Sequence, residues 1–358
     1  MYKAFAPPLY LFSLFIILLG GCSPASDQVS PQPSTEETAI LLSYLEENGD
    51  LVNSQHIPSL VTPEAVFEKL SGANQLVIDL RTDSLFALGH IQHAVNIQPA
   101  DILQYFEELI DPNAYDSIIL VCSDGMLSGY VNGVLRYLGY DNVFTMRNGL
   151  SAWNMEIAED YWLPAMSSHM LGRLETEPHP KNAAGPLPEL ATGRTSGYDI
   201  LRARAEEVLQ LGEGDMVLPA AALTADPSPY YVINYWPLNL YQEGHIEGAI
   251  QYTPKASLHS GQDLFTLPAD RPIALYCYTA HHSAFATAFL RLLGYDAHNV
   301  VYGANSFIHQ TMHDFGIPTR TFDARTPRGF PLVKQGEQGP VPDEMKTLTD
   351  TLSVEGGC

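Results

Sequence analysis

Residues 118–129 read IILVCSDGMLSG, and residues 273–284 read IALYCYTAHHSA. In each stretch a short, mostly apolar run leads directly into a cysteine, and apolar side chains with helical spacing follow. An apolar run of this kind predicts a strand that is covered on both faces of its sheet. Each stretch therefore predicts a strand, a short loop that begins with the cysteine, and a helix.

The two stretches belong to a duplication. Cys277 follows Cys122 by 155 residues (277 − 122 = 155), and three other features recur at the same distance. These are Asp79 with Asn234, Gly89-His90-Ile91 with Gly244-His245-Ile246, and Gly139-Tyr140 with Gly294-Tyr295. A period this long is that of a whole domain, not of a solenoid repeat. The 358 residues are enough for two such domains with extensions.

The elements expected around these strands alternate in type. In the first half we expect helices at residues 39–47, 63–70 and 129–138 and strands at 76–80 and 118–121. In the second half we expect strands at residues 230–234 and 273–276 and a helix at 284–293. This alternation predicts an α/β fold of two domains, each with a mainly parallel sheet flanked by helices.

Composition suggests where the domains begin and end. We predict a signal peptide at residues 1–21, a flexible tether at 22–37, a first domain at 38–158, a linker at 159–195, a second domain at 196–322 and a C-terminal tail at 323–358. The tether is rich in Ser, Pro, Gln and acidic residues, and the tail is polar and rich in Pro and Gly, as flexible connections are.

The N-terminus has the pattern of an export signal. Lys3 precedes an apolar run at residues 9–19, and small residues then lead to Cys22. The pattern resembles a bacterial lipoprotein signal, which implies a lipid on Cys22, while a secretory peptide or a short membrane helix is the alternative. We expect an exported, lipid-anchored protein on the outer membrane facing the periplasm, because Ser23 is not the Asp that suggests inner-membrane retention. Without an outer membrane, the expected place is the extracellular face of the plasma membrane.

Charge and cysteine spacing exclude two classes of partner. The chain has 18 Lys and Arg against 41 Asp and Glu, a net charge of −23, which argues against a nucleic-acid partner. Cys-x-x-Cys and zinc-type Cys/His spacings do not occur, so we expect no metal. With Cys22 lipidated, Cys122, Cys277 and Cys358 remain, an odd number that leaves at least one thiol unpaired within the chain. No pattern identifies a protein partner.

The position of the two cysteines points to chemistry. The carboxyl end of a parallel strand is where open α/β sheets bind ligands. Backbone N–H groups of the loop and of the following helix N-terminus can surround the sulfur and favour a thiolate, which is a nucleophile. A single cysteine of this kind is more often a small buried apolar side chain. Two in register favour a functional site.

Both halves resemble rhodanese-like domains. The resemblance is carried in the first half by Asp79, residues 89–94, Cys122, residues 138–140, Gly149 and Trp153, and in the second by Asn234, residues 244–249, Cys277, residues 293–295, Gly303 and Phe307. The family implies a sulfurtransferase without metal or organic cofactor. Its cysteine takes a sulfane sulfur from a small donor, such as thiosulfate, 3-mercaptopyruvate or polysulfide, and passes it from a persulfide to a thiol or another thiophilic acceptor. Loop N–H groups would stabilise the negative terminal sulfur.

Both loops depart from the thiosulfate-type pattern Cys-x-x-Gly-x-Arg, in which the arginine pairs with the anionic donor. The first loop is Ser123, Asp124, Gly125, Met126, Leu127 and Ser128, and the second is Tyr278, Thr279, Ala280, His281, His282 and Ser283. We expect Asp124 to raise the pKa of Cys122 and to repel an anionic donor. The histidines of the second loop can become cationic near neutral pH. We therefore predict Cys277 as the nucleophile, with His282 in place of the arginine, and a secondary or vestigial role for Cys122.

Other hypotheses and roles follow from the same residues. A catalytically inactive tandem protein that binds or senses a ligand is the alternative, because neither loop has the arginine. A phosphatase, which some proteins of this fold are, needs a longer loop that ends in arginine. We expect His90 and His245 to be hydrogen-bonded structural residues and Asp79 to hold loop backbone.

Overall fold

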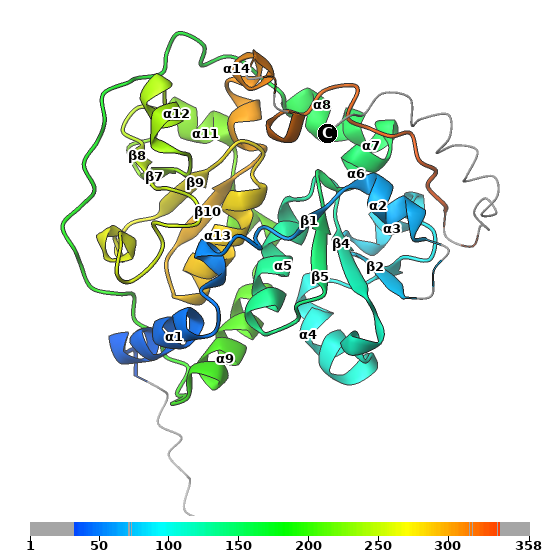
Figure 1. Cartoon of the computed structure of the whole chain (residues 1–358), viewed down its shortest axis with the longest axis horizontal. Helices are drawn as coiled ribbons and strands as arrows, with labels where there is room; N and C mark the ends of the chain where they lie inside the picture. Colours follow the sequence, from blue (N-terminus) through cyan, green and yellow to red (C-terminus); the bar gives the residue numbers. More distant parts are fainter. Residues whose placement is uncertain are drawn as a thin grey trace, which may run out of the picture. The chain divides into compact units, whose positions relative to one another are not determined.

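The structure is a computed structural model that describes residues 32–334 and 336, except 71, 73, 315 and 317 (Figure 1). The predicted signal peptide, Cys22 and Cys358 lie outside the described residues. Within the described part of the chain, no helix has the length and apolar character that a membrane crossing requires.

Each half of the chain forms a five-stranded sheet in which every strand pair is parallel. The first sheet consists of β1 (Leu60–Val61), β2 (Gln75–Asp79), β3 (Val95–Asn96), β4 (Ser117–Val121) and β5 (Val143–Met146), in the order β1-β5-β4-β2-β3. The second consists of β6 (Val217–Leu218), β7 (Tyr231–Asn234), β8 (Ile250–Gln251), β9 (Ile273–Tyr276) and β10 (Ala297–Val300), in the order β6-β10-β9-β7-β8. The matching order confirms the predicted duplication and the α/β fold.

The predicted helices are present as α1 (Thr35–Glu47), α2 (Pro63–Glu68), α5 (Met126–Tyr137) and α13 (His281–Leu292). α5 and α13 begin three residues earlier than the apolar spacing indicated, because the last residues of the cysteine loops already form their first turns. The remaining α-helices are α3 (Asp83–Leu88), α4 (Ile102–Gln104), α6 (Gly149–Trp153), α7 (Met155–Asp160), α8 (Trp162–Ala165), α9 (Gly197–Leu209), α10 (Glu213–Met216), α11 (Ala220–Ala225), α12 (Leu238–Glu243) and α14 (His309–Asp314).

Strand β4 is covered on both faces, as its apolar sequence predicts. Ile118 and Leu120 belong to one core cluster, and Ile119 and Val121, which point to the other face, belong to a second. The carboxyl end of β4, where Cys122 follows, is therefore held by packing from two sides.

The helices that follow the two cysteines pack directly on each other, and Figure 1 shows α5 and α13 side by side. Small residues make the approach possible. A Cβ atom on Gly129 would lie 3.4 Å from Cβ of Ala284, and one on Gly133 would lie 2.9 Å from Cβ of Ala288. The two halves therefore meet along the elements that also position the cysteine loops.

Each half is also completed by a segment that follows the other half. The linker segment (residues 167–193) pairs with the second half, because Glu175 and His245 form an antiparallel bridge. The C-terminal segment (residues 321–334) pairs with the first half through a bridge between His90 and Val333. Two segments that differ in sequence thus occupy equivalent places.

The C-terminal segment covers apolar surface of the first half. Phe330 is 1% exposed and stacks on Phe67 at 4.1 Å between ring centroids. Trp153 Nε1 donates a hydrogen bond to the Pro331 carbonyl at 2.9 Å. Part of the segment predicted from the sequence as a tail is therefore built into the first half.

Helix α1 packs on α9, and both contribute to the same core cluster. Leu41 and Leu45 of α1 and Ile200 and Leu201 of α9 are buried there. The sequence placed α1 at the start of the first domain, whereas its partner α9 belongs to the second half. The predicted domain boundaries themselves stay predictions.

Candidate active site

Cys122 lies at the carboxyl end of β4, and its sulfur is surrounded by the loop that follows. Gly125 N–H donates to Cys122 Sγ at 3.1 Å and Ser128 N–H at 3.5 Å. Gly125 has φ 93°, a left-handed conformation that glycine adopts without a steric penalty, and this turns its N–H toward the sulfur. The predicted arrangement of loop N–H groups around a sulfur is thus confirmed for the first loop.

The Cys122 side chain lines a cavity of about 360 Å³, although it is only 3% exposed. The cavity wall includes Arg81, Asp124, Tyr161 and Glu213, and the segment from α9 to α10 closes it from the second half. Neither Arg81 nor Glu213 was predicted as a site residue. No local pattern marks them, because they reach the cysteine only through the tertiary fold.

Arg81 is held in place by two acceptors in the wall. Its Nη2 donates to Asp79 Oδ2 at 2.7 Å and to the Gly89 carbonyl at 2.6 Å. Asp79 Oδ1 also accepts the backbone N–H of Arg81 at 3.0 Å, which confirms that Asp79 holds loop backbone. The guanidinium charge is therefore already paired with a carboxylate.

The environment of Cys122 favours the protonated thiol, so the prediction that the loop favours a thiolate is wrong for this cysteine. Burial, together with the Asp124 and Glu213 carboxylates, raises the pKa of Cys122 to about 12. The thiol can donate to Asp124 Oδ1, 3.5 Å from Sγ, and burial raises the pKa of Asp124 as well. The expectation that Asp124 raises the thiol pKa is confirmed.

Cys277 occupies the equivalent place after β9, but its sulfur has fewer hydrogen-bond donors. Within the described residues, the Ser283 hydroxyl at 3.4 Å is the only donor to Cys277 Sγ. Ala280, which replaces Gly125, has φ 64° and takes the left-handed conformation at a steric cost. The side chain of Cys277 is 3% exposed, like that of Cys122.

Aromatic side chains pack around the second loop. The counterparts of Leu80 and Arg81 are Tyr235 and Trp236, both buried, and the Trp236 ring stacks on Tyr278 at 5.0 Å. The guanidinium carbon of Arg320 lies 4.4 Å from the centre of the Tyr278 ring. Large aromatic rings thus pack against the second loop, whereas the first loop lines a cavity.

The prediction that the second loop supplies a cation from its histidines is wrong. Burial, with Arg147 and His282 nearby, lowers the pKa of His281 to about 3. Burial and the Lys255 charge lower the pKa of His282 to about 4, and His282 Nε2 contacts the Ile57 carbonyl at 3.3 Å. Neither histidine is cationic near neutral pH, so His282 does not replace the arginine.

His281 instead connects the two loops. Its Nε2 accepts the backbone N–H of Asn148 at 2.9 Å, and its Nδ1 lies 3.0 Å from Thr279 Oγ1. A Cβ atom on Gly125 would lie 2.7 Å from His281 Nε2, which shows how closely the first loop approaches this ring. The sequence predicted each loop but not their contact, because no pattern within one half reports on the other.

The rhodanese-like domain profile matches residues 62–156 and 231–309. The thiosulfate sulfurtransferase GlpE of Haemophilus influenzae (strain PittEE) is 35% identical over 94 residues, which cover 26% of this chain and 85% of that protein. The tRNA uridine(34) hydroxylase of Acaryochloris marina (strain MBIC 11017) is 23% identical over 114 residues, which cover 31% of this chain and 37% of that protein. The crystal structure of a thiosulfate sulfurtransferase from Pseudomonas aeruginosa is 18% identical, covers 74% of this chain and 46% of that chain, and has a TM-score of 0.29.

Proposed function

This chain belongs to the rhodanese-like family as a tandem member related to sulfurtransferases, and from that premise we propose that it transfers or carries sulfane sulfur through a persulfide on Cys122. The observation that carries the proposal is the position of Cys122 Sγ, which accepts the N–H groups of Gly125 and Ser128 and lines a cavity. Donors placed in this way can stabilise negative charge on sulfur when it develops.

The reaction needs a base for the thiol, and Asp124 lies where a base is required. Asp124 takes the Cys122 proton, and Sγ then attacks the sulfane sulfur of the donor. A bond forms between Sγ and that sulfur, while the donor's bond to the same sulfur breaks and its leaving group keeps the electron pair. In the second half-reaction the acceptor thiolate attacks the terminal sulfur, Sγ leaves with the electron pair, and Asp124 returns the proton.

The charges around the cavity indicate which donors suit the site. Asp124 and Glu213 are acidic, and the guanidinium of Arg81 in the wall is paired with Asp79. A dianion such as thiosulfate is therefore disfavoured relative to a donor with less negative charge. Among thiosulfate, 3-mercaptopyruvate and polysulfide, we expect thiosulfate to be the poorest.

The sequence predicted Cys277 as the nucleophile, whereas the proposal here names Cys122. One experiment distinguishes the two cysteines. The full chain, Cys122→Ser and Cys277→Ser are incubated with each donor, and the intact mass is measured. The proposal expects an added sulfur atom that Cys122→Ser loses and Cys277→Ser keeps. An adduct lost only in Cys277→Ser would return the nucleophile to the second domain.

A second candidate function is a binding or sensory module without catalysis. It is favoured by the pKa of Cys122, which burial and Asp124 raise to about 12, and by the low exposure of both cysteines. In that case the cavity binds its ligand and no sulfur is transferred. A folded chain that forms no adduct with any of the three donors would support this candidate.

The proposal includes an extracytoplasmic location. Its support is the lipoprotein-like pattern from Lys3 to Cys22, which implies a lipid anchor in the membrane and favours the periplasmic face of the outer membrane. Expression in bacteria with labelled palmitate tests it. The chain should incorporate label, and Cys22→Ala should not; label in both, or in neither, would contradict the anchor.

A further inference from the structure

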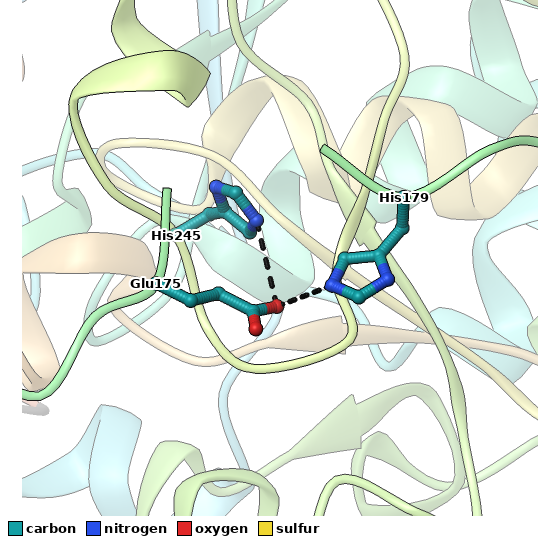
Figure 2. A group of neighbouring side chains, drawn as sticks. All are labelled: Glu175, His179 and His245. Atoms are coloured by element: carbon teal, nitrogen blue, oxygen red, sulfur yellow. Dashed lines mark hydrogen bonds and ion pairs between the residues drawn. The ribbon is translucent and has the colours of Figure 1, made fainter. Parts of the chain in front are cut away.

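Three metal-ligating side chains meet where the linker segment crosses the second domain, remote in sequence from either cysteine loop. Figure 2 shows Glu175, His179 and His245 pointing toward one another. Glu175 Oε1 lies 2.6 Å from His179 Nε2 and 3.5 Å from His245 Nε2, and the three ligand atoms all lie within 4.8 Å of one another. A carboxylate and two imidazoles from two separate segments thus share one small space.

The backbone holds these residues in place without help from a ligand. Glu175 N–H donates to the His245 carbonyl at 3.0 Å, and His245 N–H donates to the Glu175 carbonyl at 2.9 Å. The backbone N–H of His179 donates to the Tyr241 hydroxyl at 3.0 Å, and the Tyr241 ring stacks on His245 at 3.7 Å. The arrangement is preorganised, so a cation would find the ligands already assembled.

Both ring nitrogens of His245 face oxygen atoms. Nδ1 lies 2.9 Å from the Tyr241 carbonyl, and Nε2 lies 3.2 Å from the Glu177 carbonyl in addition to the Glu175 carboxylate. A neutral imidazole has a single N–H, so with Nδ1 as the donor the Nε2 lone pair points at oxygen lone pairs. A second proton or a metal cation at Nε2 removes that repulsion. The Nδ1–H bond to a backbone carbonyl is the outer-shell contact typical of metal-bound histidines.

The first half of the chain contains the matched comparison. His90 is the counterpart of His245 (245 − 90 = 155), stacks on Phe86 at 3.8 Å, and has its Nδ1 2.9 Å from the Phe86 carbonyl. Its bridge partner in the C-terminal segment is Val333, whereas the bridge partner of His245 is Glu175. The structural role shared by both histidines explains Nδ1 and the ring stacking. It does not explain why Glu175 and His179 converge on Nε2 of His245, since no such group surrounds His90 among the described residues.

We propose that Glu175, His179 and His245 bind a divalent first-row transition-metal cation, Zn²⁺ above all, with a fourth position open to water. Two imidazoles and one carboxylate are a ligand set that zinc accepts in three-residue sites with an open position. Ligand atoms about 2.0–2.1 Å from zinc in tetrahedral geometry lie roughly 3.3 Å apart. The Glu175–His245 separation already matches, and the part-exposed His179 needs only a small movement away from Glu175.

A bound ion would hold the linker segment on the second domain. The net negative charge of the chain also favours the binding of cations in general. The sequence predicted no metal site, because the three ligands come from segments that are about 70 residues apart and lack the close Cys/His spacing of zinc fingers. The inference is independent of sulfur transfer, since none of these residues touches a cysteine loop.

Zn²⁺ binding by the full chain tests the proposal, using equilibrium dialysis with metal analysis. His179→Gln and Glu175→Gln should weaken binding at least about tenfold, as loss of a ligand requires. Both side chains are part-exposed, so these variants should fold; far-UV circular dichroism checks this. His90→Gln is the matched control and should bind Zn²⁺ like the wild type.

Co²⁺ distinguishes this site from the thiols of the chain. In the wild type, Co²⁺ should give visible d–d bands without thiolate-to-cobalt charge transfer, and His179→Gln should lose those bands. Equal Zn²⁺ binding by wild type and both variants would overturn the proposal, as would no binding or a thiolate-ligated spectrum in the wild type.

Discussion

Burial and then the Asp124 carboxylate keep the sulfur at the first loop protonated. Asp124 Oδ1 lies 3.5 Å from Cys122 Sγ and also accepts the Met126 N–H at 3.0 Å, so the carboxylate is fixed beside the thiol. The presence of an acid next to this cysteine could be predicted from the sequence because the two are neighbours in one loop. The presence of Glu213 in the same cavity could not be predicted, because only the tertiary fold brings it there.

Asp124→Asn should speed alkylation of Cys122, although loss of the proposed base should slow sulfur transfer. The asparagine keeps an oxygen for the Met126 N–H but removes the negative charge, so the pKa of Cys122 should fall from about 12. Each unit by which the pKa of Cys122 falls raises its thiolate fraction about tenfold at mildly alkaline pH. The thiolate is the form that is alkylated. The rate of Cys122 alkylation by iodoacetamide, followed by peptide mass spectrometry, measures the change. Asp116→Asn, at an exposed acid outside the cavity, is the control, and an unchanged rate in Asp124→Asn would refute the electrostatic account.

His281 makes a pH-dependent contribution to stability. Its pKa is about 3 in the folded chain because of burial and the nearby Arg147 and His282, against an ordinary value of 6.5. The unfolded chain therefore takes up the proton first as the pH falls, so this contribution is complete above about pH 6.5 and is lost toward pH 3. The slope is at most about 1.4 kcal/mol per pH unit.

His281→Gln should flatten the loss of stability between about pH 6.5 and pH 4, because glutamine can still accept the Asn148 N–H but does not titrate in this range. Urea unfolding at several pH values measures the free energy of unfolding in each. His313→Gln, at an exposed histidine, should keep the steeper wild-type dependence. Identical slopes in wild type and His281→Gln would show that another group is responsible.

At the scale of elements, the strands and helices that carry the cysteines could be predicted because their apolar patterns are long enough. β1, β3, β6 and β8 have only two residues each, too short for any periodicity to indicate them. The contact between α5 and α13 could not be predicted from the sequence either, because each helix alone has only a few small residues among larger ones. The sequence therefore predicts these helices but not the surface against which each one packs.

The α5–α13 contact predicts opposite effects for two glycine substitutions. Gly133→Ala places a Cβ 2.9 Å from Cβ of Ala288, and overpacking of this kind costs about 1–3 kcal/mol. Gly129→Ala meets Ala284 Cβ at an ordinary 3.4 Å, so the gain in helix propensity of roughly 1 kcal/mol should prevail. Urea unfolding should rank the two variants on either side of the wild type. Equal stability of the two would mean that the helices move apart without cost.

For the molecule as a whole, the duplication could be predicted from the sequence, but the exchange of covering segments between the halves could not. The Gly-His-Ile feature contacts these segments in both halves, but its bridge partners, Glu175 and Val333, do not resemble each other. The polar, Pro- and Gly-rich composition of residues 323–358 also gave no indication that Phe330 is buried.

Phe330→Ala should destabilise the first half by about 3–5 kcal/mol, because it removes a buried ring stacked on Phe67 and packed at 4.9 Å against Trp153. Trp153 fluorescence during urea unfolding should report an earlier transition. Leu238→Ala, at an exposed apolar residue, should leave that transition in place. No shift in Phe330→Ala would mean that the C-terminal segment does not hold the first half closed.

The exchange of segments also has a consequence in time. Trp153 leaves the ribosome 178 residues before Pro331, the residue whose carbonyl it binds. At the usual speed of synthesis, about 10–35 s pass between the two residues. During this time the C-terminal segment does not yet exist to cover the rings of Phe67 and Trp153. The first domain to be made is thus among the last to be finished. A chain whose synthesis stops early would display this apolar surface to the cell's quality control, however well its second half had begun to fold.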